Sequence, residues 1–297
     1  MEDLGIDVIA DDGFPLPKWS KEEHLSFMDA MMIRKTVLSI PTPHIYNGDD
    51  AKAYEAAGNI NDELSLLCKE NDRFLFVAGL PVPYMEGSIK EAERAMKQLG
   101  AIGVKLPSNA YGVYLGDAAY EPLVKKLNDL KALVIIHPCR ARLRPDKCIT
   151  GKVAAIYEYP ADTTRTVLNM MANRIMTRYP DIRWLIPHCG SFLPYMLQRF
   201  TGVSWILANM GMMEQIDAKA EFERLYFDIA GDPEPVALDM LRMVIDDSHI
   251  VYGSDFPHSP AKVIEMKKKH FDENEKYDEV RDQIYHENGI KLLEGIL

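Results

Sequence analysis

The sequence predicts an α/β fold of the TIM type, a (β/α)8 barrel, from three observations. Short apolar runs alternate with longer segments of helical periodicity, which is typical of a parallel sheet covered by helices. Three of these runs lead into a histidine or an aspartate, at the strand end where such a barrel carries its chemistry. The length of 297 residues and the apolar content of 47% suffice for one large barrel, so we expect a single domain over residues 1–297.

The first half of the chain alternates regularly between strand and helix patterns. Ser20 and Glu23 form the pattern of a capping box, so we expect a helix from there to about Met32. Hydrophobic periodicity then predicts strands over 36–40, 74–80, 103–106 and 133–136, separated by helices over 50–71, 88–99 and 121–130.

The second half resumes this alternation after a long loop over 139–161. Asp162-Thr163-Thr164 is interpreted as the cap of the helix that follows the loop. Strands are expected from Trp184 to His188, over 225–229 and over 250–252, with a helix over 234–245 and a charged helical tail from Ala261. The total of seven strands is one fewer than a closed eight-stranded barrel contains.

Charge and cysteine content restrict the partners and the compartment. The net charge of −11 argues against binding to nucleic acid or to an anionic membrane, because both require clustered Lys and Arg. Cys68, Cys139, Cys148 and Cys189 have no close paired spacing, which favours a reducing compartment and hence the cytoplasm. No apolar run approaches the ~20 residues of a membrane helix, and we expect no targeting signal.

The functional interpretation depends on His137, His188 and Asp255. A single histidine at the end of an apolar run is more often a hydrogen-bonded core residue than a ligand. Three strands that end in His, His and Asp, however, would converge at one mouth of a barrel. Neutral imidazole nitrogens with one carboxylate suit a divalent cation such as zinc or manganese.

Several short segments place these three residues in a longer pattern. In chain order they are Trp19-Ser20, Val37-Leu38-Ser39, Tyr114-Leu115-Gly116-Asp117, Ile136-His137-Pro138, Asp162-Thr163-Thr164, Tyr179-Pro180-Asp181, His188-Cys189-Gly190-Ser191-Phe192-Leu193-Pro194 and Gly253-Ser254-Asp255-Phe256-Pro257. In this order and spacing the sequence, from Trp19 to about Leu293, resembles the amidohydrolase-related decarboxylase family. That family includes aminocarboxymuconate semialdehyde, gamma-resorcylate and methylsalicylate decarboxylases.

The resemblance implies a (β/α)8 barrel that holds one divalent metal, with zinc expected first and manganese as the alternative. By resemblance, His137 and Asp255 would be metal ligands, and His188 would act as the acid/base. Arg199 matches an arginine that a neighbouring subunit contributes to bind the substrate carboxylate, which implies a homodimer or a higher homo-oligomer. Sequence alone allows Arg199 equally to be a surface residue. Trp19 would belong to the substrate-binding residues.

One part of the family pattern has no counterpart in this sequence. Family members begin with a strand that ends in His-x-His and supplies further metal ligands. Either the segment from Ile6 to Asp11 is that strand with both histidines lost, or the chain begins downstream of the motif. The short spacing between Asp11 and Trp19 favours the second explanation. Both lead us to expect weak or absent metal occupancy and reduced or no activity.

The expected reaction is the non-oxidative decarboxylation of a small hydroxy-aromatic or unsaturated carboxylic acid. The metal would orient the substrate, and His188 or Asp255 would manage the proton delivered to carbon. Two alternatives remain open. The same metal and His188 could hydrolyse an ester, lactone or amide, or the chain could be a catalytically silent barrel with a binding or assembly role. The residues before Trp19 lack the arginine of semialdehyde decarboxylases, which favours a phenolic acid.

Overall fold

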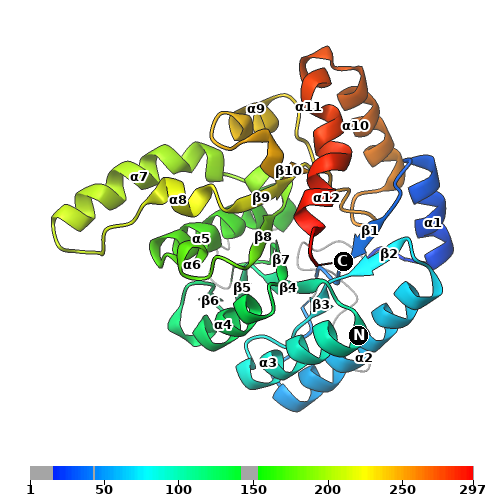
Figure 1. Ribbon diagram of the computed structural model, residues 1–297, viewed down its shortest axis with the longest axis horizontal. Coiled ribbons are helices and arrows are strands. Elements are labelled where there is room, and N and C mark those ends of the chain that lie inside the picture. The colour runs from blue at the N-terminus through cyan, green and yellow to red at the C-terminus, as the bar shows by residue number, and fades with distance from the viewer. Residues whose placement is uncertain (1–15, 43, 142–152, 297) are drawn as a thin grey trace.

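The strands form the centre of the molecule and the helices surround them (Figure 1). The computed structural model describes residues 16–42, 44–141 and 153–296. The segment 6–11, proposed above as a degenerate first strand, and Cys148 lie outside these ranges. Within the ranges, no helix has both the length and the apolar character that crossing a bilayer requires.

Parallel strands follow one another around the centre in chain order. β1 pairs with β2, and the remaining strands pair in the order β3-β4-β7-β8-β9-β10. β2 and β3 are segments of one strand interrupted at Val77, whose N–H donates to Leu38. The described residues thus contain the seven predicted strands: β1 (Thr36–Leu38), β2 (Phe74–Phe76) with β3 (Ala78–Gly79), β4 (Gly103–Pro107), β7 (Leu133–His137), β8 (Arg183–Ile186), β9 (Leu225–Asp228) and β10 (Ile250–Val251). A short hairpin of β5 (Asn109–Ala110) and β6 (Val113–Tyr114) follows β4.

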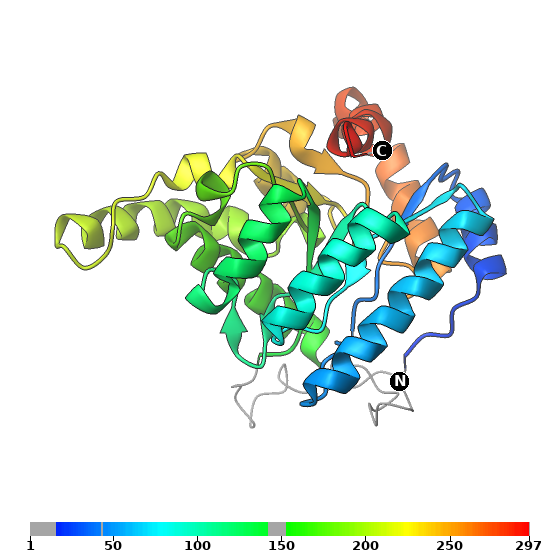
Figure 2. The ribbon, with the colours of Figure 1, turned by 60° about the horizontal axis from the view of Figure 1, so that its bottom comes forward.

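Helices cover the outside of the strands (Figures 1 and 2). Their bounds are α1 (Lys21–Ala30), α2 (Asp50–Glu70), α3 (Met85–Arg94), α4 (Glu121–Asp129), α5 (Glu158–Ala172), α6 (Ile175–Arg178), α7 (Leu193–Asn209), α8 (Ala218–Phe222), α9 (Val236–Arg242), α10 (Ala261–Glu273), α11 (Asp278–Asp282) and α12 (Asn288–Leu293). Ser20 caps α1 by accepting the N–H of Glu23, as its sequence pattern predicts. The helix predicted over 88–99 begins earlier, at Met85, and ends in a π-helical segment.

Alternate residues of each strand enter two different apolar layers. The outer layer lies between strands and helices and includes Val134 of β7. The inner layer fills the barrel and includes Leu133 of the same strand, because neighbouring side chains on a strand point to opposite faces. Leu292 of α12 joins the inner layer, and the Arg183 side chain at the start of β8 donates to its carbonyl. α12 therefore closes the amino-terminal end of the barrel.

The outer edge of β10 has no strand partner among the described residues, and the C-terminal helices satisfy its backbone. In the register of β10 with β9, Val251 bonds toward β9, so Ile250 and Tyr252 direct their backbone groups to the open side. The N–H of Tyr252 donates to the carbonyl of Ile284, and the buried Asn288 side chain donates to the carbonyl of Ile250 at 2.8 Å. The open edge is therefore protected from further strand pairing.

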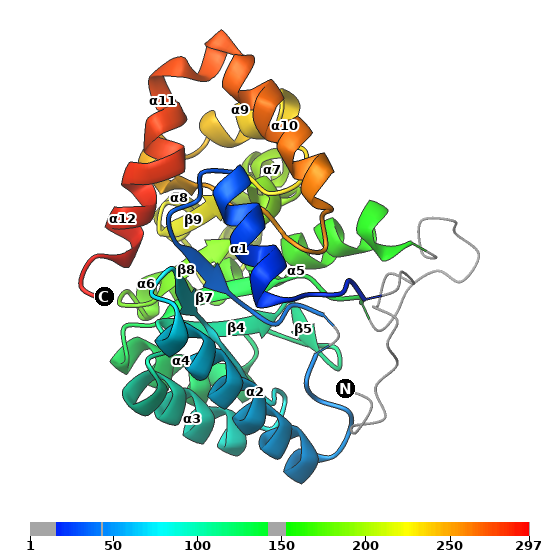
Figure 3. The same cartoon turned by 90° about the vertical axis from the view of Figure 1, so that its right-hand side faces the viewer.

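The first and last helical parts of the chain meet beside this edge. α1 lies beside α10 (Figure 3). Phe27 of α1 and Met31, which follows α1 directly, pack against Ile264 of α10. The ring of Phe27 also stacks on Phe256, with 4.2 Å between the ring centroids. Phe256 follows Asp255 directly, so this packing supports the loop that carries the predicted ligand.

The predicted helix cap at Asp162 is wrong. α5 begins four residues earlier, at Glu158, without a side-chain cap, so Asp162 lies inside the helix. Its fully buried carboxylate accepts hydrogen bonds from the loop after β4 instead of from the backbone of its own helix. Local capping propensity was overridden by these tertiary partners.

Replacing Asn288 with alanine should destabilise the fold. The change removes a buried hydrogen bond to the carbonyl of Ile250 and a partly buried one to the carbonyl of Asp247, and we expect the free energy of unfolding to fall by about 2–3 kcal/mol. Urea unfolding followed by circular dichroism measures the change. Glu287→Ala, at the exposed neighbouring position, is the control, and equal midpoints for the two variants would contradict the role given to Asn288.

Candidate active site

Polar side chains at the carboxyl ends of the strands lie above the inner apolar layer. His137, the last residue of β7, has the same parity along the strand as Leu133, which belongs to that layer. Lys105 of β4 pairs with Ile135, and Asp228 of β9 pairs with Val251. Paired residues of parallel strands project to the same face, so these side chains also face the barrel interior.

His137 and Asp255 face each other across the mouth of the barrel. His137 Nε2 lies 3.9 Å from Asp255 Oδ1. His137 Nδ1 lies 3.2 Å from the carbonyl of Pro138, which can only accept, so the ring proton is on Nδ1 and the Nε2 lone pair faces Asp255. Burial lowers the pKa of His137 despite the neighbouring Asp255. Burial alone would raise the pKa of Asp255, but His137 and His188 hold it below its ordinary value.

His188 lies beside His137 on a strained turn. It follows β8 by two residues, in a 3-10 turn over His188–Gly190. Its ring centroid is 6.3 Å from that of His137. The backbone angle φ lies between 52° and 59° at His188, Cys189, Ser191 and Asp255, a region that residues other than glycine rarely adopt. Such strain costs on the order of 1 kcal/mol or more per residue and is typical of functional sites.

Asp228 supports the His188 turn from the end of β9. Its buried carboxylate accepts the N–H of His188 at 2.9 Å and the N–H of Ala230 at 3.0 Å. Burial raises the pKa of Asp228. Gly253 leaves space for this carboxylate, since a Cβ there would lie 2.8 Å from Asp228 Cγ. Glycine is therefore required two residues before Asp255.

Lys105 and His44 form a second polar pair at the mouth. The Lys105 ammonium donates to the carbonyl of Pro41 at 2.7 Å and to His44 Nδ1 at 2.9 Å. The neutral His44 ring therefore carries its proton on Nε2, which is buried and has no hydrogen-bond partner among the described residues. Burial, with Lys105 and His137 nearby, holds the pKa of His44 well below its usual range.

Comparison with known proteins identifies the family. A family model described as amidohydrolase matches residues 44–295. The decarboxylase yanB of Aspergillus niger is 32% identical over 266 residues, which cover 85% of this chain and 72% of that protein. The chain belongs to the amidohydrolase family. Further relatives include a 6-methylsalicylic acid decarboxylase of Penicillium expansum and a gamma-resorcylate decarboxylase of Rhizobium sp..

Solved structures confirm the predicted barrel fold. A crystal structure of an amidohydrolase II matches with a TM-score of 0.89 and 28% identity, covering 95% of this chain and 91% of that one. A dihydroxybenzoic acid decarboxylase from Polaromonas sp. JS666, solved with bound manganese and 2-nitroresorcinol, matches with a TM-score of 0.82 and 22% identity over 92% of this chain and 86% of that one. At this identity the second likeness concerns the fold alone.

The structure brings some of the predicted residues together and leaves others apart. His137, His188 and Asp255 share the mouth of the barrel. Trp19 lies beside α1, where its Nε1–H donates to His24 at 2.9 Å, and it is 40% exposed. Arg199 is exposed on α7, which projects from the barrel (Figure 1). Within one subunit, Arg199 is thus on a surface helix rather than among the residues of the mouth.

Sequence reasoning missed Lys105, His44 and Asp228. Asp228 could have been found, because it ends the apolar run of β9 just as His137 ends that of β7. Lys105 also carried a signal, since a lysine inside an apolar strand is unusual. His44 carried no signal, because it lies in a loop and only the fold brings it to Lys105.

The residues present fit part of a metal site. The 3.9 Å between His137 Nε2 and Asp255 Oδ1 is within the about 4.2 Å that two metal–donor bonds of about 2.1 Å can span. Across the described ranges, however, no three His, Cys, Asp or Glu side chains gather closely enough to hold an ion. The described residues therefore supply two donors for a divalent ion.

Asp228→Asn should stabilise the folded chain at neutral pH. Because the pKa of Asp228 is raised, the folded chain retains a proton that the unfolded chain releases, so wild-type stability falls as pH rises from the ordinary value of 3.8 through the raised pKa. Asparagine keeps an oxygen for the two backbone donors without this charge. We expect a higher urea midpoint than wild type at pH 7.5 and a smaller difference at pH 4.5. The exposed Asp232→Asn is the control, and a midpoint below wild type at pH 7.5 would contradict the assignment.

Proposed function

We propose that this member of the amidohydrolase family is a metal-dependent decarboxylase of a small hydroxy-aromatic acid. The observation that carries the proposal is the grouping of His137, Asp255 and His188 at one mouth of the barrel. The decarboxylase relatives and the manganese and nitroresorcinol bound to the Polaromonas enzyme support this reading of the site. We also propose that the whole chain acts as a single barrel domain in the cytoplasm.

His137 and Asp255 would hold the divalent ion, with manganese supported by the Polaromonas enzyme and zinc as the alternative. When bound, the ion would act as a Lewis acid that orients and neutralises the oxygens of the substrate. Because the described residues supply two donors, we propose that the ion is held weakly and must be added for activity.

His188 would deliver the proton that the reaction requires. Decarboxylation breaks the bond between the ring carbon and the carboxylate carbon, the electron pair stays on the ring carbon, and carbon dioxide leaves. That ring carbon must receive a proton. The His188 ring lies next to His137 on a turn that Asp228 holds, so it is the best placed of the described side chains to provide it.

Lys105 and His44 favour an anionic, oxygen-rich substrate. Lys105 brings a positive charge to the mouth, and it orients His44 so that Nε2–H is available as a donor. A carboxylate or a phenolic oxygen would satisfy this donor. The pair therefore supports a hydroxy-aromatic acid over an uncharged ester or lactone.

Carbon dioxide release from a panel of hydroxybenzoates tests the function. With added Mn²⁺ we expect turnover of at least one hydroxybenzoate, and none without the metal. His188→Gln should lower kcat by about 10²–10⁴-fold, because it removes the proton donor. Muconate semialdehydes and lactones are the comparison substrates. Lactone hydrolysis without carbon dioxide release would favour the hydrolase. Near-normal turnover by His188→Gln would contradict the role of His188 as proton donor. Stoichiometric metal retained through dialysis would contradict weak metal binding.

We further propose that Arg199 acts on the substrate carboxylate of a neighbouring subunit, with Trp19 at the margin of the same site. Arg199→Ala and His188→Ala should each be nearly inactive. A mixture refolded together should recover about a quarter of wild-type activity, because half of the dimers are mixed and each has one intact site. If Arg199 acts within its own subunit or only on the surface, mixing will restore nothing beyond the sum of the two variants.

A further inference from the structure

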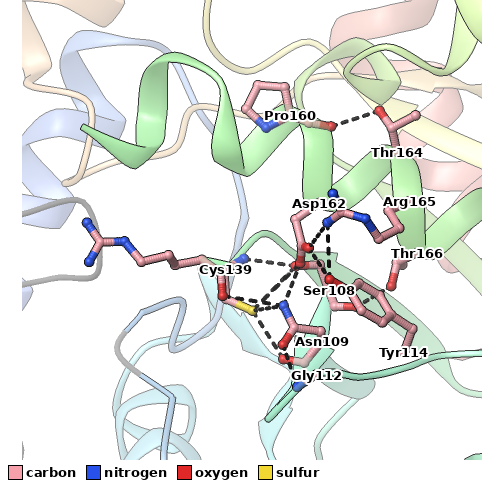
Figure 4. Close-up of polar contacts among 11 residues, drawn as sticks. Ser108, Asn109, Gly112, Tyr114, Cys139, Pro160, Asp162, Thr164, Arg165 and Thr166 are labelled. Atoms are coloured by element: carbon pink, nitrogen blue, oxygen red, sulfur yellow. Dashed lines mark hydrogen bonds and ion pairs between the residues drawn. The ribbon is translucent and has the colours of Figure 1, made fainter. Parts of the chain in front are cut away.

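The buried carboxylate of Asp162 is the centre of a polar network that the proposed chemistry does not use (Figure 4). Asp162 is fully buried on α5. Its Oδ1 accepts from Tyr114 OH at 2.6 Å and from Arg165 Nη1 at 2.6 Å. Its Oδ2 accepts from Asn109 Nδ2 at 2.7 Å and from the Ser108 hydroxyl at 2.5 Å. Three of these four donors, those of Ser108, Asn109 and Tyr114, come from the segment after β4 and hold it against α5, whereas Arg165 is on α5 itself.

Ser108 connects this network to the turn that carries His137. Its backbone N–H donates to the carbonyl of His137 at 2.9 Å. Because its hydroxyl proton goes to Asp162, its oxygen can accept the N–H of Cys139, also at 2.9 Å. The residues on both sides of Pro138 are thus bound to one serine whose orientation Asp162 sets.

Thr164 makes the corresponding connection to the turn that carries His188. Its hydroxyl donates to the carbonyl of Pro160 at 2.7 Å (Figure 4). The same hydroxyl accepts the N–H of Phe192 at 3.1 Å. Phe192 ends the segment in which His188, Cys189 and Ser191 have positive φ. A turn in this conformation persists only when its surroundings hold it.

The spacing of the two residues on the helix explains how one element reaches both turns. Asp162 and Thr164 are two positions apart on α5, which separates their side chains by about 200° around the helix axis. One side chain therefore points toward the end of β7 and the other toward the turn after β8.

We infer that Asp162 and Thr164 are positioning residues that together set the spacing between His137 and His188. The inference rests on the proposed function only for the roles of the two histidines. The hydrogen bonds by which Asp162, through Ser108, and Thr164 hold the two turns form a clamp, which is a property of the folded chain. Groups that hold metal-binding or catalytic side chains in this way typically affect metal affinity or activity by about 10–100-fold.

Thr163 provides a matched control within the same helical turn. It is buried, as Asp162 and Thr164 are, but its hydroxyl has no hydrogen-bond partner among the described residues. Thr163→Val and Thr164→Val replace a hydroxyl by a methyl group of similar size at adjacent positions. A purely structural contribution of buried threonines predicts similar effects for both.

The test compares these variants with Ser108→Ala, which removes the hydroxyl that joins Asp162 to the N–H of Cys139 and leaves the Asp162 side chain in place. We expect Thr164→Val to speed amide exchange at Phe192 and Ser108→Ala to speed it at Cys139, each at least 10-fold, in metal-free protein. In both variants we also expect kcat to fall about 10–100-fold with KM little changed. The affinity for Mn²⁺ should fall about 10-fold in Ser108→Ala. Thr164→Ser, which keeps the hydroxyl, should regain most of the kcat lost in Thr164→Val. Thr163→Val should match wild type throughout.

The exchange measurements separate this inference from the proposed function. If wild type shows no decarboxylation and no Mn²⁺ binding, the proposed function fails. The exchange rates at Cys139 and Phe192 then still show whether Ser108 and Thr164 hold the two turns. The inference is overturned if Thr164→Val and Ser108→Ala match Thr163→Val in exchange. It is also overturned if exchange increases in an active enzyme while kcat and Mn²⁺ affinity stay at wild-type values.

Discussion

Parallel pairing in register from β4 through β7, β8 and β9 to β10 is the constraint on which the candidate site depends. Each strand ends at the same side of the barrel, so polar residues far apart in the chain arrive at one mouth. The alternation of side chains then separates the two environments within each strand. Inward residues near the start of a strand build the apolar layer, and inward residues near its end, such as Lys105, His137 and Asp228, face the mouth. The apolar layer beneath these groups limits their hydration, which is why burial is the largest influence on the pKa of His137 and of Asp228.

The loops beyond the strand ends need separate support because several of their residues have unfavourable backbone angles. His188 and Asp255 both have positive φ, and neither is a glycine. Asp228 and α5 hold the first of these turns, while the stacked rings of Phe27 and Phe256 pack beside the second. Rigidity at the mouth thus comes from the helices and the neighbouring strand. Placing reactive groups on such supported turns allows their geometry to be set in advance of substrate binding.

The side of the barrel between β10 and β1 differs from the rest. Elsewhere the backbone groups of a strand form hydrogen bonds with the neighbouring strand. In the described residues, the backbone groups on the open side of β10 instead bond to Ile284 and Asn288. Beside them, α1 packs on α10. The amidohydrolase fold therefore remains well packed with seven described strands. The same region matters for the proposed metal site, because His137 and Asp255 would provide two donors and the resemblance implies further ligands on a first strand. The alternative of a catalytically silent barrel and the decarboxylase differ mainly in what completes this side of the mouth.

Local patterns in the sequence determined the α/β class, the seven strands and the polar residues at their ends, because hydrophobic periodicity and strand-ending residues are properties of short segments. They also determined the grouping of His137, His188 and Asp255, since parallel strands necessarily end together. Only the tertiary structure decided the partners of Asp162, which was predicted to cap a helix and instead binds residues more than fifty positions away, such as Asn109. The same holds for the pairing of His44 with Lys105. These contacts depend on how loops and helices from distant parts of the chain pack, and no short segment encodes that packing.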